Sequence, residues 1–90
     1  MPRKRSRLDI ITDMLSSLQE HSGEMKPTHL MYKSNMSHIQ MNSYLDELLE
    51  KELVKKIKKK NNDYVIITDK GFGFLDKLRQ MKEFEKTFGI

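Results

Sequence analysis

The stretch that decides the fold is SHIQMNSYLDELLEKEL, residues 37–53. Its apolar side chains recur at helical spacing, which places them on one face of an α-helix. They are Met41, Tyr44, Leu45 and Leu48. The opposite face carries Ile39, Ser43, Asp46 and Glu50. We therefore expect a helix that packs on a core with one face and presents the side chains of its first two turns to another molecule.

The start of this helix carries a capping signal. Ser37 is a preferred cap, and Gln40 three residues later completes a capping box. The Gln40 side chain then has two alternatives. It can reach back to the backbone of Ser37, or forward to a bound molecule.

Two helices are predicted before this one. Ser6 and Asp9 form another capping pattern, and apolar residues recur at helical spacing up to Leu18, so the first helix spans about 7–21. Pro27 suits the first position of a short helix that continues over 28–33.

The segments that follow these two helices contain residues that end helices or favour turns. Ser22-Gly23 is expected to stop the first helix. Residues 34–36 form a turn in which Asn35 tolerates the left-handed backbone conformation. The arrangement predicts two helices joined by a short turn, with 37–51 as the second of them.

A hairpin and a last helix follow. Residues 53–57 and 64–68 are predicted strands, joined by a polar tip over 58–63. Thr68 can cap a final helix that runs to about Phe88. The predicted fold class is therefore α+β, mainly α.

The last helix is too long and too apolar for a small domain to cover alone. Phe72 and Leu75 are expected to serve the domain's own core. The remaining apolar residues fall near a coiled-coil seam, which predicts a homodimer through antiparallel packing of this helix. The predicted dimer interface is Phe74, Leu78, Met81, Phe84 and Phe88. The alternative is a single chain whose last helix folds back on the first.

Composition excludes several classes of protein. Ninety residues fit one small domain, and the absence of Cys removes disulfide and thiolate metal sites. No apolar run is long enough to span a membrane, and the basic N-terminus lacks the apolar segment of a secretory signal. The expected location is therefore the cytoplasm, on the nucleoid.

No catalytic or cofactor site is expected. The three histidines have no metal-ligand spacing, so no metal is predicted. The acidic residues between 46 and 52 lie among lysines and suit a solvated helix face better than acid–base catalysis. We predict no enzyme activity, no cofactor and no small-molecule ligand.

Positive charge is concentrated in two short stretches. The net charge of the chain is +4, but residues 1–8 hold four basic and no acidic residues, and residues 54–60 hold five lysines and no acid. The rest of the chain is acidic. Such asymmetry predicts a polyanionic partner. The alternative is a set of solvated lysines at a flexible tail and a loop tip.

Two segments carry a resemblance to a known family. They are LMYKSNMSHIQMNSYLDELLEKELV at residues 30–54 and YVIITDKGFGFLDKL at residues 64–78. They resemble the small archaeal winged helix-turn-helix DNA-binding proteins, which archaeal viruses also encode. The resemblance covers about 8–78, and its most specific parts are residues 31–37 and 67–71. It implies a DNA-binding homodimer with the long C-terminal helix as the dimer element, acting in the host cytoplasm if the gene is viral.

The chain departs from that family pattern at two places. Glu52 stands where the family usually has Gly after the recognition helix, so Glu52 must adopt a strained conformation or extend the helix. The family's recognition helix is often lysine-rich at positions that match Ile39, Asn42 and Ser43, whereas this one is neutral. Attraction to phosphate would then come from the N-terminus and the hairpin.

The predicted organisation is a flexible basic arm at 1–5, a winged helix-turn-helix domain at 6–68 and a dimerisation helix at 69–90. Helix 37–51 is expected in the major groove of double-stranded DNA, and the wing 58–63 on the backbone or in the minor groove. The predicted base-reading residues are His38, Ile39, Gln40, Asn42 and Ser43. The predicted backbone contacts are Lys26, Thr28, Tyr32, Lys33 and Ser37. The predicted wing contacts are Lys56, Lys58, Lys59, Lys60, Asn61 and Asn62. The predicted arm contacts are Arg3, Lys4, Arg5 and Arg7.

Several alternatives remain open at this point. Asn42 and Ser43 can be solvated helix surface, and Tyr32 can belong to the core or its rim. A site-specific transcriptional regulator is favoured, because the helix offers amide and hydroxyl groups that read bases. The alternatives are an architectural protein that binds DNA without sequence preference, and a winged helix that docks another protein.

Overall fold

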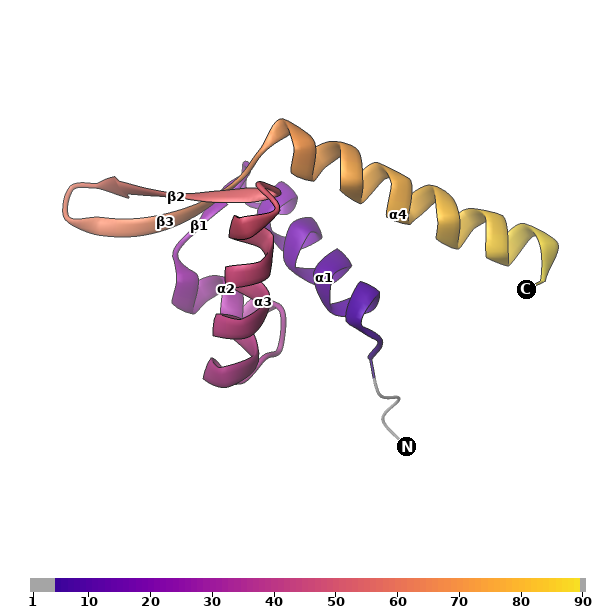
Figure 1. The fold of residues 1–90 in the computed structure, drawn as a ribbon, viewed down its shortest axis with the longest axis horizontal. Helices are drawn as coiled ribbons and strands as arrows, with labels where there is room; N and C mark the ends of the chain where they lie inside the picture. Colours follow the sequence, from indigo (N-terminus) through magenta and orange to yellow (C-terminus); the bar gives the residue numbers. More distant parts are fainter. Residues whose placement is uncertain (1–4, 90) are drawn as a thin grey trace.

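The computed structural model describes residues 5–89. Four helices gather at the base of a small antiparallel sheet, and the last helix extends well beyond the rest of the molecule (Figure 1). The predicted fold class is confirmed, with a long helix at the C-terminal end. None of the described helices is both long and apolar enough to cross a membrane.

The first three helices begin where the sequence predicts. Helix α1 spans Arg7–Glu20 and α3 spans His38–Glu50, and each has a complete capping box at its start. Helix α2 spans Pro27–Lys33 with proline at its first position. The turn before α3 contains Asn35 at φ 54°, in the predicted left-handed conformation.

The sheet has three strands in the order β1-β3-β2. Strand β1, Glu24–Met25, pairs with β3 and was not predicted, because two residues carry no recognisable periodicity. Strands β2, Val54–Lys59, and β3, Asn62–Ile67, are longer at the hairpin end than expected. The predicted loop over 58–63 is therefore too long: the turn is only Lys60-Asn61, both at positive φ, as a type I′ hairpin turn requires.

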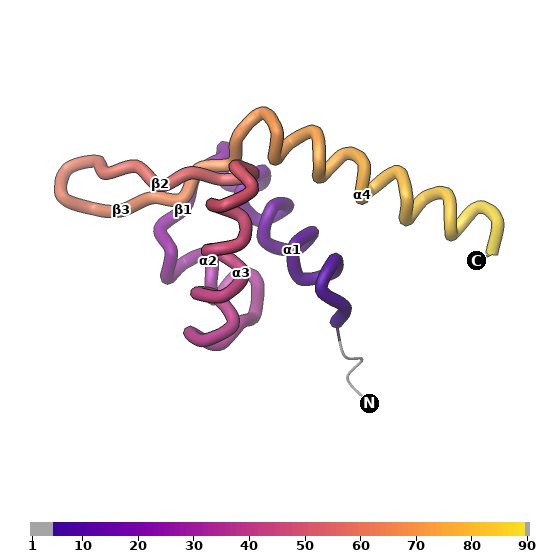
Figure 2. The backbone as a smooth tube through the Cα atoms, in the orientation of Figure 1, coloured from indigo at the N-terminus to yellow at the C-terminus, as the bar shows by residue number. Residues whose placement is uncertain are grey.

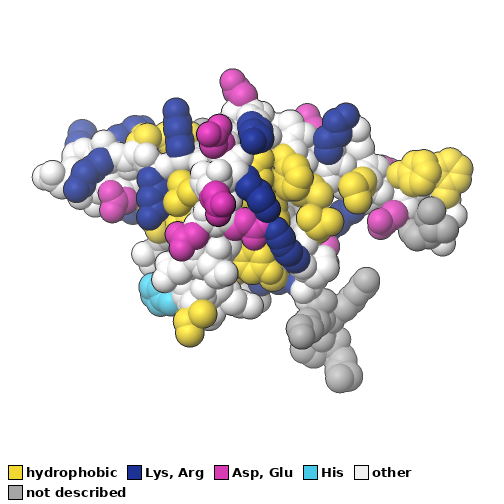
Figure 3. Space-filling view, viewed as in Figure 1, with side chains coloured by type: hydrophobic (Ala, Val, Ile, Leu, Met, Phe, Trp, Pro, Cys, Tyr) yellow, Lys and Arg dark blue, Asp and Glu magenta, His cyan; other side chains and the backbone are white. Residues whose placement is uncertain are grey.

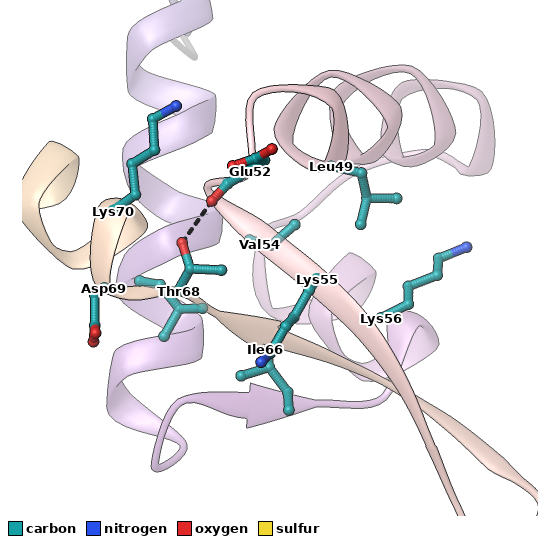
Figure 4. A pocket seen from close by; sticks show the side chains of 10 residues that line it. Leu49, Glu52, Val54, Lys55, Lys56, Ile66, Thr68, Asp69 and Lys70 are labelled. Atoms are coloured by element: carbon teal, nitrogen blue, oxygen red, sulfur yellow. Dashed lines mark hydrogen bonds between the residues drawn. The ribbon is translucent and has the colours of Figure 1, made fainter.

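The junction between α3 and the sheet resolves the question about Glu52. Its φ is 60°, so this residue adopts the strained left-handed conformation instead of extending the helix. Its carbonyl oxygen accepts a 2.7 Å hydrogen bond from Thr68 Oγ1, which lies at the start of α4 (Figure 4). The same hydroxyl caps α4 by accepting from the N–H of Gly71.

The core lies between α1, α2, α3, the base of the sheet and the first half of α4. Met14, Leu15 and Leu18 of α1 are fully buried at its centre, together with Leu75 of α4. Phe72 was expected in this core and is instead exposed. The reason is helical geometry, because the face of α4 that meets α1 is defined by Leu75 and Leu78.

Helix α4 spans Asp69–Phe88 and continues past the core (Figure 2). Its first half packs against α1, whereas its last turns extend away from the wing and from α3. Gly89, in the left-handed conformation, ends the helix. The molecule consequently measures 48 Å along its longest axis and 22 Å along its shortest.

Candidate nucleic-acid interface

The first two turns of α3 have one buried face and one exposed face. Met41, Leu45 and Leu48 are buried and fix the helix to the core. The predicted readers His38, Ile39, Asn42 and Ser43 are all exposed. Ile39 is 83% exposed, which is unusual for an isoleucine in a domain with a well-formed core. These side chains are therefore accessible at the surface.

Gln40 follows one of its two predicted alternatives. Its side-chain oxygen accepts a 3.2 Å hydrogen bond from the backbone N–H of Ser37, while Ser37 Oγ accepts from the N–H of Gln40. Both polar side chains are thus occupied in the cap of α3. Reading a base with Gln40 would require the first of these bonds to open.

A shallow hollow joins three of the predicted contact groups. It has a volume of ≈ 130 Å³ and is lined by residues of α2, α3 and β2. Thr28 comes from the start of α2, His38 and Asn42 from α3, and Lys56 from β2. Residues that are far apart in the sequence therefore surround one surface depression beside the recognition helix.

The other predicted backbone contacts are also accessible. Lys26, Lys33 and Ser37 are exposed. Tyr32 is 73% exposed, so the alternative that placed its ring in the core is wrong. Its hydroxyl is available to a phosphate oxygen.

The wing has two different faces. Side chains alternate along a strand, so Val54, Lys56 and Lys58 share one face of β2, and Lys55, Ile57 and Lys59 share the other. Val54 is buried in the core, and Lys56 lines the hollow beside α3. Lys56 and Lys58 therefore lie on the face of the hairpin that is turned towards the core and α3.

Lys59, a predicted wing contact, is paired with an acidic residue of the same chain. Its ammonium lies 2.8 Å from both carboxylate oxygens of Glu24 and 5.7 Å from the centre of the Tyr64 ring. Glu24 was not identified as important in the sequence, because it is 35 positions from Lys59 and no local pattern connects them. This ion pair connects the wing to β1, and the Glu24 carboxylate compensates the positive charge of Lys59.

The hairpin tip keeps its other predicted contacts at the surface. Lys60, Asn61 and Asn62 are exposed, and the Asn62 amide donates a long 3.4 Å bond to the Lys60 carbonyl. Basic side chains are prominent over this end of the molecule in the space-filling view (Figure 3). The wing thus presents positive charge beyond the edge of the core.

Arg5 and Arg7 contact other residues of the same chain. Arg3 and Lys4 lie outside the described residues. Arg5 and Arg7 were predicted as arm contacts to DNA, but Arg5 is hydrogen-bonded to Asp13 and to two backbone carbonyls, and Arg7 forms an ion pair with Glu47. The prediction of a flexible arm is therefore corrected at Arg5, because a carboxylate and two backbone carbonyls hold its guanidinium.

The predicted dimer residues divide into two groups. Leu78 is only 5% exposed and packs in the core, so it is not available to a partner; Phe74 is half-buried against the same core. Met81, Phe84 and Phe88 are exposed, and the rings of the two phenylalanines are 4.7 Å apart. Among the predicted dimer residues, the exposed ones therefore lie in the last turns of α4, where hydrophobic side chains gather in Figure 3.

Two other hollows include no residue of α2 or of the first two turns of α3. The larger, ≈ 680 Å³, lies where α3, β2 and α4 meet, and its charged side chains point in different directions rather than towards a common centre (Figure 4). The smaller, ≈ 270 Å³, lies between α1 and α4 and includes Asp9 and Lys82. Neither has the convergent polar groups of a ligand site.

Asp9 is the group in this region whose pKa clearly departs from its ordinary value. The hydrogen bond from Lys82, whose Nζ lies 3.0 Å from Asp9 Oδ1, and the bonds from the backbone and side chain of Ser6 lower the pKa of Asp9 from 3.8 to about 2. The charge couples the start of α1 to α4. Asp9 also lies in the first turn of α1, where the helix dipole favours a negative charge.

Two of the three histidines contact each other. His21 and His29 contact each other with ring centres 4.9 Å apart, and His21 Nδ1 lies 2.9 Å from the Ser17 carbonyl. Within residues 5–89, no three His, Cys, Asp or Glu side chains come together as metal ligands.

Comparisons with known proteins agree on one architecture. A family model described as winged helix-turn-helix matches residues 4–86. The structure of Sso10a-2, a DNA-binding protein from Sulfolobus solfataricus, aligns with a TM-score of 0.79 and 17% identity, over 93% of this chain and 85% of that chain. F93 from STIV, a winged-helix DNA-binding protein, aligns with a TM-score of 0.76 and 16% identity, over 93% and 95% of the two chains.

A third similar structure comes from a larger protein. A MarR family transcriptional regulator from Silicibacter pomeroyi aligns with a TM-score of 0.75 and 22% identity, over 86% of this chain but only 53% of that chain. No curated protein matches the sequence. At these identities the structural likeness establishes the fold.

Proposed function

Since the chain belongs to the winged helix-turn-helix family, we propose that it binds double-stranded DNA as a site-specific transcriptional regulator. The family and fold predicted from the sequence are confirmed, and the family is not one of enzymes. In the proposed complex, the first two turns of α3 enter the major groove and the wing lies on the backbone or in the minor groove. Residues 6–68 would carry the DNA contacts, and 69–90 the dimer contacts.

The observation that carries this proposal is the outward-facing start of α3, which lacks lysine and arginine. His38, Ile39, Asn42 and Ser43 are all exposed there. An asparagine can bond both edge groups of adenine, and an exposed isoleucine can meet a thymine methyl group. A protein that only coats DNA would gain more from lysine at these positions, because phosphate attraction supplies nearly all non-specific affinity.

The positive charge of the interface lies beside this helix. Lys56 lines the hollow that also contains His38 and Asn42, and Thr28 lies on its other side. Phosphate contacts from these flanks would set the register of the helix in the groove. Sequence reading and electrostatic attraction are thus assigned to different elements.

The proposal includes a homodimer. Met81, Phe84 and Phe88 leave an apolar surface on α4 that this chain does not cover. In an antiparallel pair of α4 helices centred near Met81, Phe88 of one copy would lie opposite Phe74 of the other, because both are seven residues from that centre. Such a dimer would place two recognition helices on one DNA molecule in the cytoplasm.

The test begins by selecting duplexes from a pool with about 20 randomised base pairs, which is two helical turns. Fluorescence anisotropy then compares the enriched duplex with a random one across a salt series. We expect a preference of ~10³-fold or more that persists as salt rises. Equal and steeply salt-dependent binding to both duplexes would favour the architectural function, and no binding at low salt would leave the protein-docking function.

Two variants test whether the preference for the enriched duplex depends on α3. Asn42→Ala should reduce the preference by about tenfold and leave binding to the random duplex unchanged, because it removes a base contact and no charge. Gln19→Ala is the matched control, since Gln19 is an exposed polar residue on α1. Equal effects of the two variants would contradict the assignment of Asn42.

A further inference from the structure

Arg5 makes an unusual set of contacts for a residue near the start of a chain. Its Nη1 lies 2.8 Å from Asp13 Oδ2 and 2.6 Å from the carbonyl oxygen of Ser34. Its Nη2 lies 2.7 Å from the carbonyl oxygen of Asn35. One guanidinium therefore joins α1 to two consecutive carbonyls of the turn between α2 and α3.

That turn decides where the recognition helix begins. Ser34 is the C-cap of α2 and is 1% exposed, and Asn35 is held at φ 54°. The N–H of Met36 then donates to the Met31 carbonyl, and Ser37 caps α3. Only Met36 separates Asn35 from the Ser37 cap, so a shift of the turn would move His38 and Ile39.

Carbonyl groups at the end of a helix lack intrahelical donors and carry partial negative charge. The Arg5 guanidinium donates hydrogen bonds to both carbonyls, and its positive charge is attracted to their partial negative charge. The Asp13 carboxylate on α1 forms an ion pair with the guanidinium and orients it. The contact is therefore built from three partners with complementary geometry.

We propose that Arg5 is a positioning residue that fixes the amino-terminal end of α3 relative to α1, and that it is not a phosphate contact. The proposal rests on the proposed function, in that this end of α3 is the part that reads DNA. It assigns to Arg5 a part in sequence discrimination without contact with the bases. Loss of Arg5 should loosen the turn and weaken the preference for one sequence over another.

Arg5→Lys is the decisive variant, because it keeps the positive charge. An ammonium cannot reproduce the planar fork that reaches two carbonyls and a carboxylate together. If Arg5 acted on phosphate as a point charge, lysine would largely replace it. Arg79→Lys is the matched control, since Arg79 lies in α4 and makes a 3.3 Å bond to Ser16 Oγ of α1.

The first measurement uses the full chain without DNA. Amide hydrogen exchange at Met36, Gln40 and Met41 reports the turn and the first turn of α3, because their N–H groups are bonded there. We expect exchange at these amides to become about tenfold faster in Arg5→Lys, while amides in α4 stay as in the wild type. Unchanged exchange at the turn would overturn the proposal, whether or not the protein binds DNA.

The second measurement separates positioning from phosphate contact. For Arg5→Lys we expect the preference for the enriched duplex to fall by about tenfold, with the slope of log K against log salt unchanged. Arg5→Ala removes the charge as well and should give the same slope. A slope that falls by about 0.9 in Arg5→Ala, with equal losses on both duplexes, would make Arg5 a phosphate contact and overturn the proposal.

Failure of the proposed function would look different. In that case the wild type itself would show no preference or no binding, and the exchange measurement alone would decide the role of Arg5. Faster exchange confined to the turn would then support a positioning role for the start of α3.

Discussion

Gly71 is the position at which one added methyl group would disturb the molecule most directly. A Cβ there would lie 2.1 Å from the carbonyl oxygen of Leu53 and 2.8 Å from Ile67 Cγ1. The Leu53 carbonyl cannot easily move away, because it already accepts a 3.1 Å bond from the N–H of Thr68. The first turn of α4 therefore approaches the chain before β2 more closely than any side chain would allow.

We predict that Gly71→Ala lowers the free energy of unfolding by about 3 kcal/mol, because the clash forces backbone apart. Gly73, two residues later in the same helix, has nothing within 4 Å of its Cβ position. Gly73→Ala should therefore raise the free energy of unfolding by about 0.5–1 kcal/mol through reduced backbone entropy of the unfolded chain. Urea unfolding followed by circular dichroism measures both, and equal stability of the two variants would refute the close contact.

At the scale of an element, the wing is a hairpin with two unlike faces. Lys56 lies on the face next to α3, and Lys59 lies on the other, where Glu24 neutralises it. The two lysines are three residues apart and carry the same charge. Their different surroundings predict different contributions to DNA binding.

We predict that Lys56→Ala lowers the slope of log K against log salt by about 0.9, equally for all duplexes, because one phosphate contact is lost. Lys59→Ala should change the slope much less, since its ammonium already has the Glu24 carboxylate as a partner. Anisotropy titrations over the same salt series measure both slopes. The prediction fails if the two variants lose the same slope.

The contact between α1 and α4 has its own titratable group. Hydrogen bonds from Lys82 and Ser6 lower the pKa of Asp9 to about 2, so the charged form is favoured in the folded protein. A lowered pKa stabilises the fold above the ordinary value of 3.8 and ceases to do so as pH falls towards 2. The pair is exposed enough that its effect is modest.

We predict that the urea midpoint of the wild type falls more steeply between pH 4 and pH 2 than that of Asp9→Asn. The other carboxyl groups titrate in both proteins, so the difference between the two curves isolates Asp9. Lys82→Gln should reduce this difference, because it removes the largest cause of the lowered pKa. Parallel curves for wild type and Asp9→Asn would contradict the coupling.

At the scale of the whole molecule, the wing and the end of α4 extend in opposite directions from one small core (Figure 1). The wing is charged, whereas the last turns of α4 carry Met81, Phe84 and Phe88 at the surface, the last of them 65% exposed. Apolar surface of this kind on an isolated helix end has no partner within residues 5–89. A second copy of the chain is the partner that we propose.

We predict that the wild type is a dimer whose melting temperature rises with protein concentration. The double variant Met81→Gln/Phe88→Gln should be monomeric with a melting temperature that is independent of concentration, because the apolar seam is lost. Glu83→Gln is the control, since Glu83 points to the opposite side of α4 on a helical wheel. Light scattering after size-exclusion chromatography measures the mass, and a monomeric wild type would refute the dimer.

Short-range features of this protein could be predicted from the sequence alone. The capping boxes at Ser6 and Ser37, the left-handed Asn35 and the cap of α4 at Thr68 are as predicted. The outward position of Ile39 also agrees with the helical wheel. These features depend on hydrogen bonds, steric limits and periodicity within a few residues of one chain segment, so the local sequence is sufficient to determine them.

Other features were decided only by the tertiary structure. Strand β1 exists because Glu24 and Met25 meet β3, and Arg5 is anchored because the turn at Ser34 and Asn35 lies beside α1. Leu78 is buried because α1 covers it, although its spacing equally suits a dimer seam. Each of these outcomes joins residues that are distant in the chain, and such contacts depend on how the elements pack together, which local patterns do not encode.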